Sequence, residues 1–388
     1  MKDIRVAIIG TGVVSRQHME RYRKIPNVKV IAACDINRGK LEAWCKEWDV
    51  ENAYTDFRAM LQRDDIDAVD VCLHNNLHLP MALEVMKAGK HCYCEKPMAG
   101  SYIDAKTMYE ASKKYNKELS IHLDFIFHPQ TRLAREMVEA DDLGHVYHAR
   151  SVGYRRKMRP GLDVPPPAFS MDFITKKYAE HGALYDMGVY HISQMLYILG
   201  APELERVSGS VYQELPIDPR LPGANRMEVE EMGVGFAKYK GGLTLDIIET
   251  WAIHMDDLGT GFVAGSKGGL RFTRNSGQSG LKFITEVRGR TIESDLQVAA
   301  NASAETFVNP DLRFFADDQA NWIAYLSGEI SQRYDTAWLA LQTMKVSEGI
   351  FLSSKLGREV TADEIESLSV SSAIRSQETE WGTFRYDI

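Results

Sequence analysis

The stretch Arg5-Val6-Ala7-Ile8-Ile9-Gly10-Thr11-Gly12-Val13-Val14-Ser15 decides the fold of this 388-residue chain. A short apolar run is followed by the pattern Gly-x-Gly-x-x-Ser and then by a helical stretch that reaches about Arg23. Gly10 permits a tight turn, and Gly12 lets the backbone approach a pyrophosphate, whose charge suits the N-terminus of the helix. Ser15 stands where a third Gly or Ala is usual, but it is small enough for close packing. The stretch predicts a dinucleotide-binding turn, against the alternative of an ordinary strand–turn–helix.

A second signal follows the next apolar run, Val28 to Cys34, which is succeeded directly by Asp35. Asp35 lies 20 residues beyond Ser15, where a carboxylate accepts the ribose hydroxyls of NAD and repels the 2′-phosphate of NADP. Arg38 weakens this discrimination because it could hold a phosphate. We therefore expect NAD as the cofactor, with NADP less favoured. The cofactor contacts expected from these two loops are Gly10, Thr11, Gly12, Val13, Val14, Asp35, Ile36 and Arg38.

Apolar strands and helices alternate over the first third of the chain. Further runs at 68–73, 91–94 and 118–122 are separated by helical patterns, which predicts a parallel sheet covered on both faces. Beyond Asp124 successive strands predict a mostly antiparallel sheet, with Gly241-Gly242 as a hairpin turn. We expect an α/β protein with a doubly wound Rossmann domain at 1–123 and a second α/β domain at 124–388. The strands expected in the second domain cover 146–154, 206–212, 229–239, 243–251, 270–273 and 281–287.

Composition limits the partners. The chain has 46 Lys and Arg against 54 Asp and Glu, and this net charge of −8 argues against a nucleic-acid or anionic-membrane surface. No apolar run approaches the ~20 residues that cross a bilayer, and an apolar strand begins almost at Met1, so a cytoplasmic location is expected. Most of the five cysteines fall in predicted strands as small buried hydrophobes. A metal site at Cys92 and Cys94 is the alternative, but no second ligand pair is visible and no metal is expected.

A more specific motif is Gly89-Lys90-His91-Cys92-Tyr93-Cys94-Glu95-Lys96-Pro97, in which Glu-Lys-Pro follows a strand. With Asn75 and His78 upstream, and with Gly182 to Gly188 and Val263 to Gly269 downstream, the chain resembles the Gfo/Idh/MocA family of NAD(P)-dependent oxidoreductases. The resemblance implies a Rossmann domain and then a large, open, mostly antiparallel sheet. One face of that sheet carries the substrate site and the other often carries an oligomer interface, so a homo-oligomer is expected. The resemblance adds Leu73, His74, Asn75, His78, Glu95 and Lys96 to the expected cofactor contacts, although His74 stands where Pro is common.

Lys96 is the residue on which the expected chemistry depends. It stands two residues past the end of a predicted strand, at the edge where parallel sheets bind ligands. An ammonium group there can bond a substrate hydroxyl and stabilise the charge that develops as hydride leaves, or relay the proton. Spacing alone leaves a surface lysine before a helix as the alternative, and the resemblance favours the catalytic role.

The proton acceptor is expected on the helix from Gly182 to Gly200. The family pattern is Asp-x-Gly-x-His, with Asp and His four apart on one helical face, whereas this chain has Asp186, Tyr190 and His191. Tyr190 occupies the position four beyond Asp186, and His191 falls about 140° away from Asp186 on an ideal helix. Geometry favours Tyr190, whereas chemistry near neutral pH favours His191, so both remain candidates. Asp186 is expected to orient the substrate or the base.

Further polar residues are expected to line the substrate site. Their positions, at the domain junction, at the end of a strand and just before the key helix, suggest contacts with a polyol. These candidates are His122, Asp124, Tyr154, Arg155, Arg156 and His181. The tail from Glu378 to Ile388 carries Trp381, Phe384 and Tyr386, and we expect it to dock on the body of the protein or on a neighbouring subunit.

Together these features predict an NAD-dependent dehydrogenase that oxidises a secondary hydroxyl of a small-molecule sugar, glycoside or cyclitol. Oxidation at C3 of a glucosyl group is the preferred example among the reactions that the resemblance implies, with inositol dehydrogenation next. One alternative is a glycosidase of the same family, which oxidises C3 transiently and eliminates the aglycone. It would need one more acid/base pair, for which His122, Asp124 and His181 are candidates. The other alternative is a non-catalytic sugar or nucleotide sensor, which should lack the set formed by Lys96, Asp186 and Tyr190 or His191.

Overall fold

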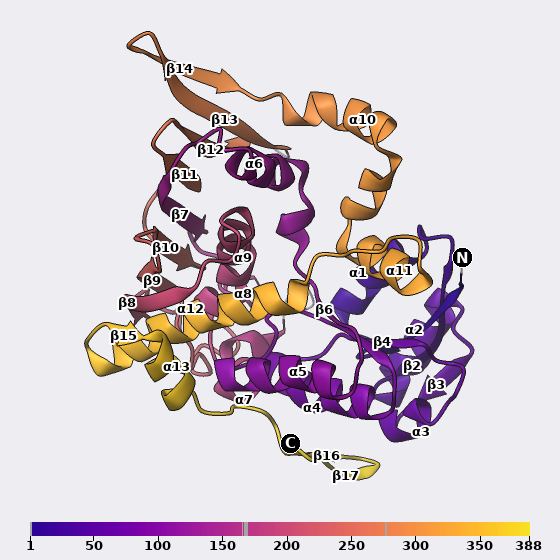
Figure 1. Ribbon diagram of the computed structural model, residues 1–388. Coiled ribbons are helices and arrows are strands. Elements are labelled where there is room, and N and C mark those ends of the chain that lie inside the picture. Colours follow the sequence, from indigo (N-terminus) through magenta and orange to yellow (C-terminus); the bar gives the residue numbers. More distant parts are fainter. Residues whose placement is uncertain (1, 165, 167–169, 276–277) are drawn as a thin grey trace.

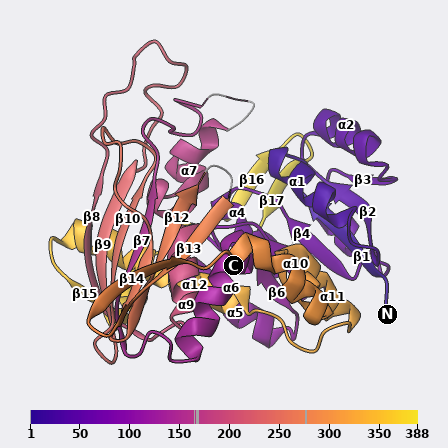
Figure 2. The ribbon, with the colours of Figure 1, turned by 90° about the horizontal axis from the view of Figure 1, so that it is seen from above.

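The computed structural model describes residues 2–164, 166, 170–275 and 278–388. Within these ranges the chain forms two large sheets and a small C-terminal hairpin (Figure 1). Figure 2 shows helices α9 (Gly188–Ile198) and α12 (Thr336–Leu356) between the two large sheets. The predicted combination of a parallel and a mostly antiparallel sheet is confirmed.

The first sheet has the strand order of a doubly wound fold. Its order is β3-β2-β1-β4-β5-β6, and every pair of neighbours is parallel. The order reverses between β1 and β4, and such a switch point opens a crevice at the carboxyl ends of the strands. The strands are β1 (Ile4–Ile9), β2 (Val28–Cys34), β3 (Asn52–Tyr54), β4 (Ala68–Val71), β5 (His91–Cys94) and β6 (Leu119–Ile121). The covering helices are α1 (Val13–Tyr22), α2 (Arg38–Trp48), α3 (Phe57–Leu61), α4 (Asn75–Lys87) and α5 (Tyr102–Lys114).

The second sheet has the order β14-β13-β12-β11-β7-β10-β9-β8-β15 within the described residues. Its neighbours are antiparallel except for β7 and β10, which run parallel. Gly241 and Gly242 connect β9 to β10 with φ of +87° and +88°, so the predicted hairpin turn is confirmed. The strands are β7 (Val146–Tyr154), β8 (Leu204–Tyr212), β9 (Met232–Tyr239), β10 (Thr244–Thr250), β11 (Phe262–Gly265), β12 (Gly268–Asn275), β13 (Gln278–Val287), β14 (Arg290–Asp295) and β15 (Val360–Thr361).

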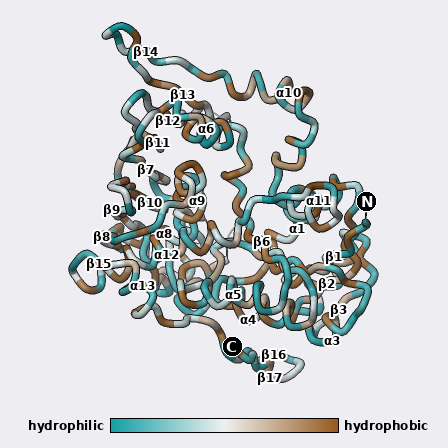
Figure 3. The backbone as a smooth tube through the Cα atoms, in the orientation of Figure 1, coloured by the Kyte–Doolittle hydropathy of each residue, from teal (hydrophilic) through white to brown (hydrophobic). Residues whose placement is uncertain are grey.

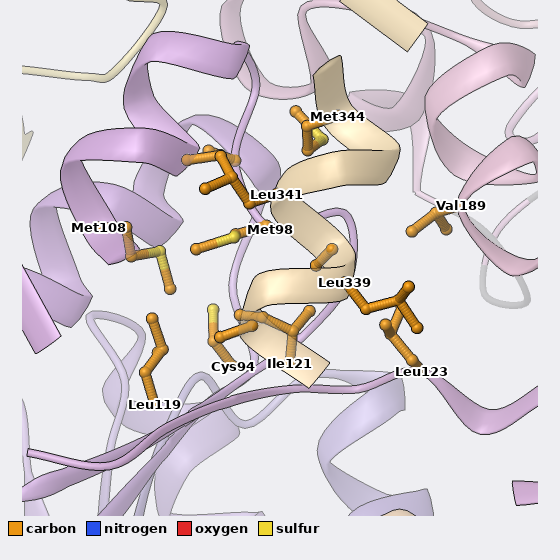
Figure 4. Packing of buried hydrophobic residues seen from close by; sticks show 14 of the residues in the cluster. Cys94, Met98, Met108, Leu119, Ile121, Leu123, Val189, Leu339, Leu341 and Met344 are labelled. Carbon is orange, nitrogen blue, oxygen red and sulfur yellow. The ribbon is translucent and has the colours of Figure 1, made fainter. Parts of the chain in front are cut away.

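Helix α12 joins the two halves of the molecule. Figure 4 shows Leu339, Leu341 and Met344 of this helix packed against Met98 and Ile121 from the first sheet and its loops. All of these side chains are nearly or fully buried, so one apolar core continues from the first sheet to the second. The other helical segments of the second half are η1 (Asp124–Phe127), α6 (Pro129–Glu139), η2 (Met171–Ile174), α7 (Lys176–Ala179), α8 (Ala183–Asp186), α10 (Val298–Val308), η3 (Pro310–Phe315), α11 (Asp318–Ser327) and α13 (Ala362–Leu368).

Helix α11, which lies within the predicted second domain of 124–388, packs against the first sheet. Trp322 and Ile323 of this helix are buried in the same cluster as Ile4 and Val6 of β1. The strand β1 is apolar on both faces, and α11 supplies part of the cover that one of these faces needs. The Rossmann domain is therefore completed by a helix made near the end of the chain, at the right of Figure 1.

The C-terminal tail docks on the body of the protein, as one of the two sequence alternatives expects. It forms the hairpin β16 (Ser376–Thr379) and β17 (Gly382–Arg385). The side chains of Phe384 and Tyr386 are 2% and 8% exposed, and both rings contact Phe57 of α3. The aromatic residues of the tail are therefore part of the packing of the Rossmann domain.

Hydrophobic residues are spread over both sheets and over the helices between them (Figure 3). In the part of the chain that the structure describes, no helix is long and apolar enough to cross a membrane.

Candidate active site

The glycine turn after β1 has the shape that a pyrophosphate needs. Gly10 has a φ of +94°, and a Cβ atom there would lie 2.2 Å from the carbonyl oxygen of Cys72. A Cβ on Gly12 would meet open space, and helix α1 begins there with neither a side-chain cap nor an acidic residue in its first turn. The helix N-terminus thus presents its partial positive charge to a space that an anion can enter.

Ser15 takes part in packing rather than in contact with a ligand. Its hydroxyl donates to the carbonyl oxygen of Gly12 at 2.7 Å and accepts a hydrogen bond from Nε1 of Trp44 at 3.0 Å. The side chain is fully buried between α1 and α2. This explains how the chain accommodates a serine at the third position of the glycine motif.

Asp35 lies at the carboxyl end of β2, beside the glycine turn. Its Oδ2 accepts hydrogen bonds from the backbone N–H and the hydroxyl of Thr11, both at 2.9 Å. Its Oδ1 accepts from the backbone N–H of Asn37 at 2.8 Å. A carboxylate oxygen has about two acceptor sites, so Oδ1 keeps one for a ribose hydroxyl. These residues fit the adenosine half of a dinucleotide.

The loop between β4 and α4 faces the second half of the chain. His74 lies 3.3 Å from a carboxylate oxygen of Asp172, and the amide of Asn75 donates to the carbonyl oxygen of Ala179 at 3.1 Å. Burial lowers the pKa of His74 although Asp172 opposes this effect. The loop is thereby held against η2 and α7, beside the predicted cofactor site.

His78, a predicted cofactor contact, has a backbone carbonyl close to each of its ring nitrogens. Its Nδ1 lies 2.8 Å from the carbonyl oxygen of Pro97, and its Nε2 lies 3.0 Å from that of Leu73. Burial lowers the pKa of His78, so the neutral ring donates to one of these two oxygens. His78 braces the β4–α4 loop against the turn that carries Lys96, whose peptide bond to Pro97 is cis.

Lys96 joins the two halves of the predicted site. Its ammonium donates to Oδ1 of Asp186 at 2.7 Å and to the backbone carbonyl of the same residue at 3.2 Å. It also lies 4.8 Å from the centre of the Tyr190 ring. An ammonium has three donors, so one remains for a ligand after the two bonds to Asp186. The structure thus brings together Lys96, Asp186 and Tyr190, which the sequence predicts as a set.

The charges of this pair are fixed by mutual attraction in a buried place. Burial alone would lower the pKa of Lys96, but the charge of Asp186 raises it well above its usual range. Burial would likewise raise the pKa of Asp186, but Lys96 lowers it. The other carboxylate oxygen of Asp186 accepts from Nε1 of Trp251 at 3.0 Å. The ion pair therefore persists at neutral pH, with Lys96 as a permanent cation.

The predicted helix from Gly182 to Gly200 is divided in two. Helix α8 ends at Asp186, Met187 forms the junction, and α9 begins at Gly188. The backbone N–H groups of Gly182 and Leu184 donate to the buried carboxylate of Glu230 at 2.8 and 3.1 Å. Glu230 thus holds the start of α8, the helix that ends at Asp186. Despite the break between the helices, Asp186 and Tyr190 both contact Lys96.

His191 points toward the second sheet. Its Nδ1 lies 3.0 Å from Oε2 of Glu249 in β10, whose other oxygen accepts from the hydroxyl of Ser151 at 3.1 Å. A Cβ at Gly153 would lie 2.3 Å from both the His191 ring and the Glu249 carboxylate, so only glycine leaves room for this pair. His191 and Tyr190 therefore face different sides, as their spacing predicts.

Glu95, next to Lys96, enters a buried network instead of facing a ligand. Its Oε1 lies 2.7 Å from Nε2 of His18, whose Nδ1 lies 2.8 Å from Asp70 in β4. Its Oε2 accepts from the backbone N–H of Lys96 at 3.0 Å. Burial would raise the pKa of Glu95, but the charges of His122 and His18 lower it. Glu95, a predicted cofactor contact, thus helps to fix the turn that carries Lys96.

His122, a predicted substrate contact, belongs to the same buried network. Its Nδ1 lies 2.6 Å from Oδ2 of Asp318 and 2.8 Å from the hydroxyl of Tyr93. Burial would lower the pKa of His122, but Asp318 and Glu95 raise it. The geometry of His18, Glu95 and His122 would also suit a metal ion, but their side chains already pair with one another and with Asp70 and Asp318.

The remaining substrate candidates are not gathered at one place. Asp124 contacts Arg21 at 3.4 Å and His128 at 3.6 Å, and the hydroxyl of Tyr154 donates to Asp257 at 2.9 Å. The charge of Arg155 helps to lower the pKa of Asp186, after the larger effects of burial and of Lys96. Arg155 is therefore close enough to Asp186 to act on its charge, while Arg156 is exposed.

His181, another predicted substrate contact, packs among aromatic rings. Its ring lies 4.2 Å from that of Tyr185 and 4.0 Å from that of Phe351 in α12. Burial lowers the pKa of His181 to about 3, so the ring is neutral. It packs against α12, because the turn before α8 directs it toward these aromatic rings.

Sequence reasoning did not identify three residues that shape the site. Trp251 holds Asp186, Glu249 holds His191, and Asp172 contacts His74. Glu249 and Trp251 stand at the end of a predicted strand. An acidic residue in a buried strand indicates a charged or hydrogen-bonding partner, because a buried charge is costly without one. Asp172 lies in η2, a short helical turn that has no sequence signature.

The fold and the geometry together define a Rossmann-fold oxidoreductase, and comparisons with known proteins agree. The family model described as "Oxidoreductase family, NAD-binding Rossmann fold" matches residues 4–123, and the model of the GFO/IDH/MocA C-terminal domain matches residues 131–271. The chain belongs to the Gfo/Idh/MocA family of oxidoreductases.

Relatives of the chain include sugar dehydrogenases. The D-glucoside 3-dehydrogenase of Escherichia coli (strain K12) is 30% identical over 213 residues, which span 55% of this chain and 58% of that protein. The levoglucosan dehydrogenase of Pseudarthrobacter phenanthrenivorans is 26% identical over 300 residues, or 74% of this chain and 72% of that protein. A solved levoglucosan dehydrogenase in complex with NADH and levoglucosan superposes with a TM-score of 0.74 at 20% identity, covering 92% of this chain and 99% of that one. The chain thus matches little more than half the length of the glucoside dehydrogenase.

Proposed function

We propose that this protein is an NAD-dependent dehydrogenase that oxidises a secondary hydroxyl of a sugar, a glycoside or a cyclitol. The observation that carries the proposal is the buried ion pair between Lys96 and Asp186, which lies at the carboxyl edge of the first sheet with Tyr190 beside it. Names of relatives, among them glucoside and levoglucosan dehydrogenases, support the substrate class. Oxidation of the C3 hydroxyl of a glucosyl group is the preferred reaction.

The residues divide the chemistry between them. The dinucleotide, when bound, supplies the redox chemistry by taking the hydride from the carbon of the substrate. Lys96 donates its third N–H to the reacting oxygen and stabilises the negative charge that develops there. Because its pKa is raised, Lys96 keeps its proton at neutral pH, so the hydroxyl proton passes to another group. Asp186 orients Lys96 and balances its charge.

The proton passes to Tyr190 or to His191. Tyr190 shares Lys96 with Asp186, which favours it on geometry. Burial raises the pKa of Tyr190 although Lys96 opposes this effect, so Tyr190 is a better proton donor than acceptor at neutral pH. His191 is held by Glu249 on the neighbouring side and is the alternative.

The glycosidase alternative lacks support from the same geometry. It needs a second acid/base pair, and His122, Asp124 and His181 are engaged with Asp318, Arg21 and Phe351 respectively. Among the described residues, none of these three side chains forms a hydrogen bond or ion pair with Lys96 or Asp186. The sensor alternative is opposed by the assembled Lys96 and Asp186 pair.

A substrate panel tests the proposal. Sugars, glycosides and inositols are each incubated with NAD or NADP, and the reduced cofactor and the products are measured together. We expect one keto product for each reduced NAD, with at least one glucoside or cyclitol as substrate and with NAD preferred over NADP. Release of free sugar without net reduced cofactor would establish the glycosidase, and no reaction with any substrate would overturn both enzyme proposals.

A further inference from the structure

The C-terminal tail crosses the Rossmann domain at the side where the adenosine half of a dinucleotide is expected. It is anchored first at the start of α4, where the backbone N–H of Ile374 donates to the carbonyl oxygen of Asn76 at 2.9 Å. It is anchored again at α3, where Phe384 lies 5.6 Å from Phe57 and beneath the guanidinium of Arg58. Figure 1 shows the resulting hairpin, β16 and β17, below α4.

Trp381, at the tip of this hairpin, reaches the loop that follows β2. Its Nε1 donates to the backbone carbonyl of Ile36 at 3.1 Å. The guanidinium carbon of Arg38 lies 4.8 Å from the centre of its ring. These two residues follow Asp35, the expected partner of the adenosine ribose, so Trp381 touches the loop that would surround that ribose.

The contact changes what Arg38 can offer to a ligand. Arg38 is a long, exposed side chain, and Trp381 fixes its planar group by stacking. Among the described residues, Arg38 makes no side-chain hydrogen bond or ion pair, so its N–H groups remain available. A side chain that is ordered before binding loses less entropy when a ligand arrives.

We propose that Trp381 is a positioning residue for the adenosine half of the dinucleotide, acting through Arg38, while its bond to the carbonyl of Ile36 holds the indole ring in place. The proposal rests on the proposed function, because it assumes that this edge binds NAD. The proposal makes the C-terminal hairpin part of the cofactor site. This hairpin lies outside the residues that the two family models match. The ligand class is an adenosine diphosphate group with a ribose attached.

The test measures binding rather than turnover. Calorimetric titration with NADH and with ADP-ribose is compared for the parent protein, Trp381→Ala and Trp338→Ala. Trp338 is a matched control, since its side chain is 43% exposed and stacks on Tyr109, far along the chain on α12. We expect Trp381→Ala to raise the Kd of both ligands roughly fivefold to tenfold, and Trp338→Ala to leave both within about twofold.

Three further variants separate positioning from a general loss of structure. Trp381→Phe keeps a ring under Arg38 and should recover part of the affinity. Arg38→Ala should weaken ADP-ribose by a similar factor, and adding Trp381→Ala to it should have little further effect, because both act through one contact. In the reaction, Trp381→Ala should raise KM for NAD while kcat at saturating NAD stays unchanged.

The outcomes distinguish this inference from the proposed function. If the parent protein binds neither NADH nor ADP-ribose, the proposed function fails and this inference fails with it. If the parent binds both and Trp381→Ala binds ADP-ribose within twofold of the parent, only this inference fails. Equal, additive losses in the Arg38 and Trp381 variants would also overturn the positioning role.

Discussion

Lys96 shows how a single side chain can be placed by residues that are distant in sequence. Its ammonium is held by Asp186, and its backbone N–H is held by Glu95, which is itself fixed by His18. The sequence places Lys96 at the end of a strand and pairs it with Asp186 through a family resemblance. It could not reveal the support from His18, because a histidine in an amphipathic helix carries no sign of its buried partners.

Removal of the Lys96 ammonium should reduce turnover far more than cofactor binding. We expect Lys96→Ala to lower kcat at least about 100-fold, since it removes the donor to the reacting oxygen. The Kd for NADH should stay within a fewfold of the parent value. Lys29→Ala, which changes an exposed lysine, serves as the control. Turnover close to that of the parent would remove Lys96 from the mechanism.

The pH dependence of oxidation should identify the proton acceptor. Because the pKa of Tyr190 is raised, a tyrosine acceptor predicts a rate that still climbs above pH ~9. In that case Tyr190→Phe should lose at least about 100-fold in kcat, and His191→Gln should lose much less. The reverse order of losses, with a rate that does not climb above pH ~9, would assign the proton to His191.

At the scale of secondary-structure elements, the order of strands and helices in the first third follows from the sequence. Apolar runs and the glycine turn predict β1, α1 and β2 because parallel strands are buried on both faces. The break at Met187 is different, since the sequence from Gly182 to Gly200 has no proline, and Asp186 or Gly188 alone does not end a helix. Glu230, from a loop nearly fifty residues later, binds the N–H groups at the start of α8, and no local pattern reveals this contact.

The buried network around His18 and His122 links α1, β4, β5 and α11. Its histidines should make the stability of the fold depend on pH. The pKa of His122 is raised in the folded chain, against the effect of burial, by Asp318 and Glu95. A raised pKa stabilises the fold fully below the unfolded value of about 6.5, and this contribution is lost as the pH rises through the folded value. Asp318, whose folded pKa is about 2 because His122 outweighs burial, loses its contribution only as the pH falls toward that value.

We therefore expect the free energy of unfolding to fall as the pH rises above about 6.5, by up to about 1.4 kcal/mol per pH unit for each histidine that releases its proton. Urea unfolding at several pH values measures this slope. His122→Gln should flatten the slope, whereas His128→Gln, which changes a half-exposed histidine, should leave it intact. An unchanged slope in His122→Gln would show that this histidine does not titrate with folding.

At the scale of the whole molecule, the chain does not divide into two consecutive domains. Helix α11 and the hairpin β16–β17 both return to the first sheet, and α12 lies between the sheets (Figure 1). Local sequence patterns predict the helices themselves, but they do not say which sheet a late helix will cover. Such long-range packing depends on the apolar surface that the other elements leave open.

A substitution of Trp322 tests whether α11 belongs to the core of the first sheet. It is 1% exposed and lies 5.1 Å from the ring of Tyr93 in β5. Trp322→Ala should lower the free energy of unfolding by roughly 3–5 kcal/mol, the usual cost of emptying a large buried site. Trp338→Ala, on an exposed ring, should cost less than about 1 kcal/mol. Denaturant midpoints measure both, and equal small losses would contradict the role of α11 in the first core.

The return of α11 also sets an order of events during synthesis on the ribosome. Helix α11 begins at Asp318, so it is made about three hundred residues after strand β1 and helix α1. Until then, the apolar surface that contains Ile4 and Val6 lacks part of its cover. Strand β1 is therefore finished long after it is made.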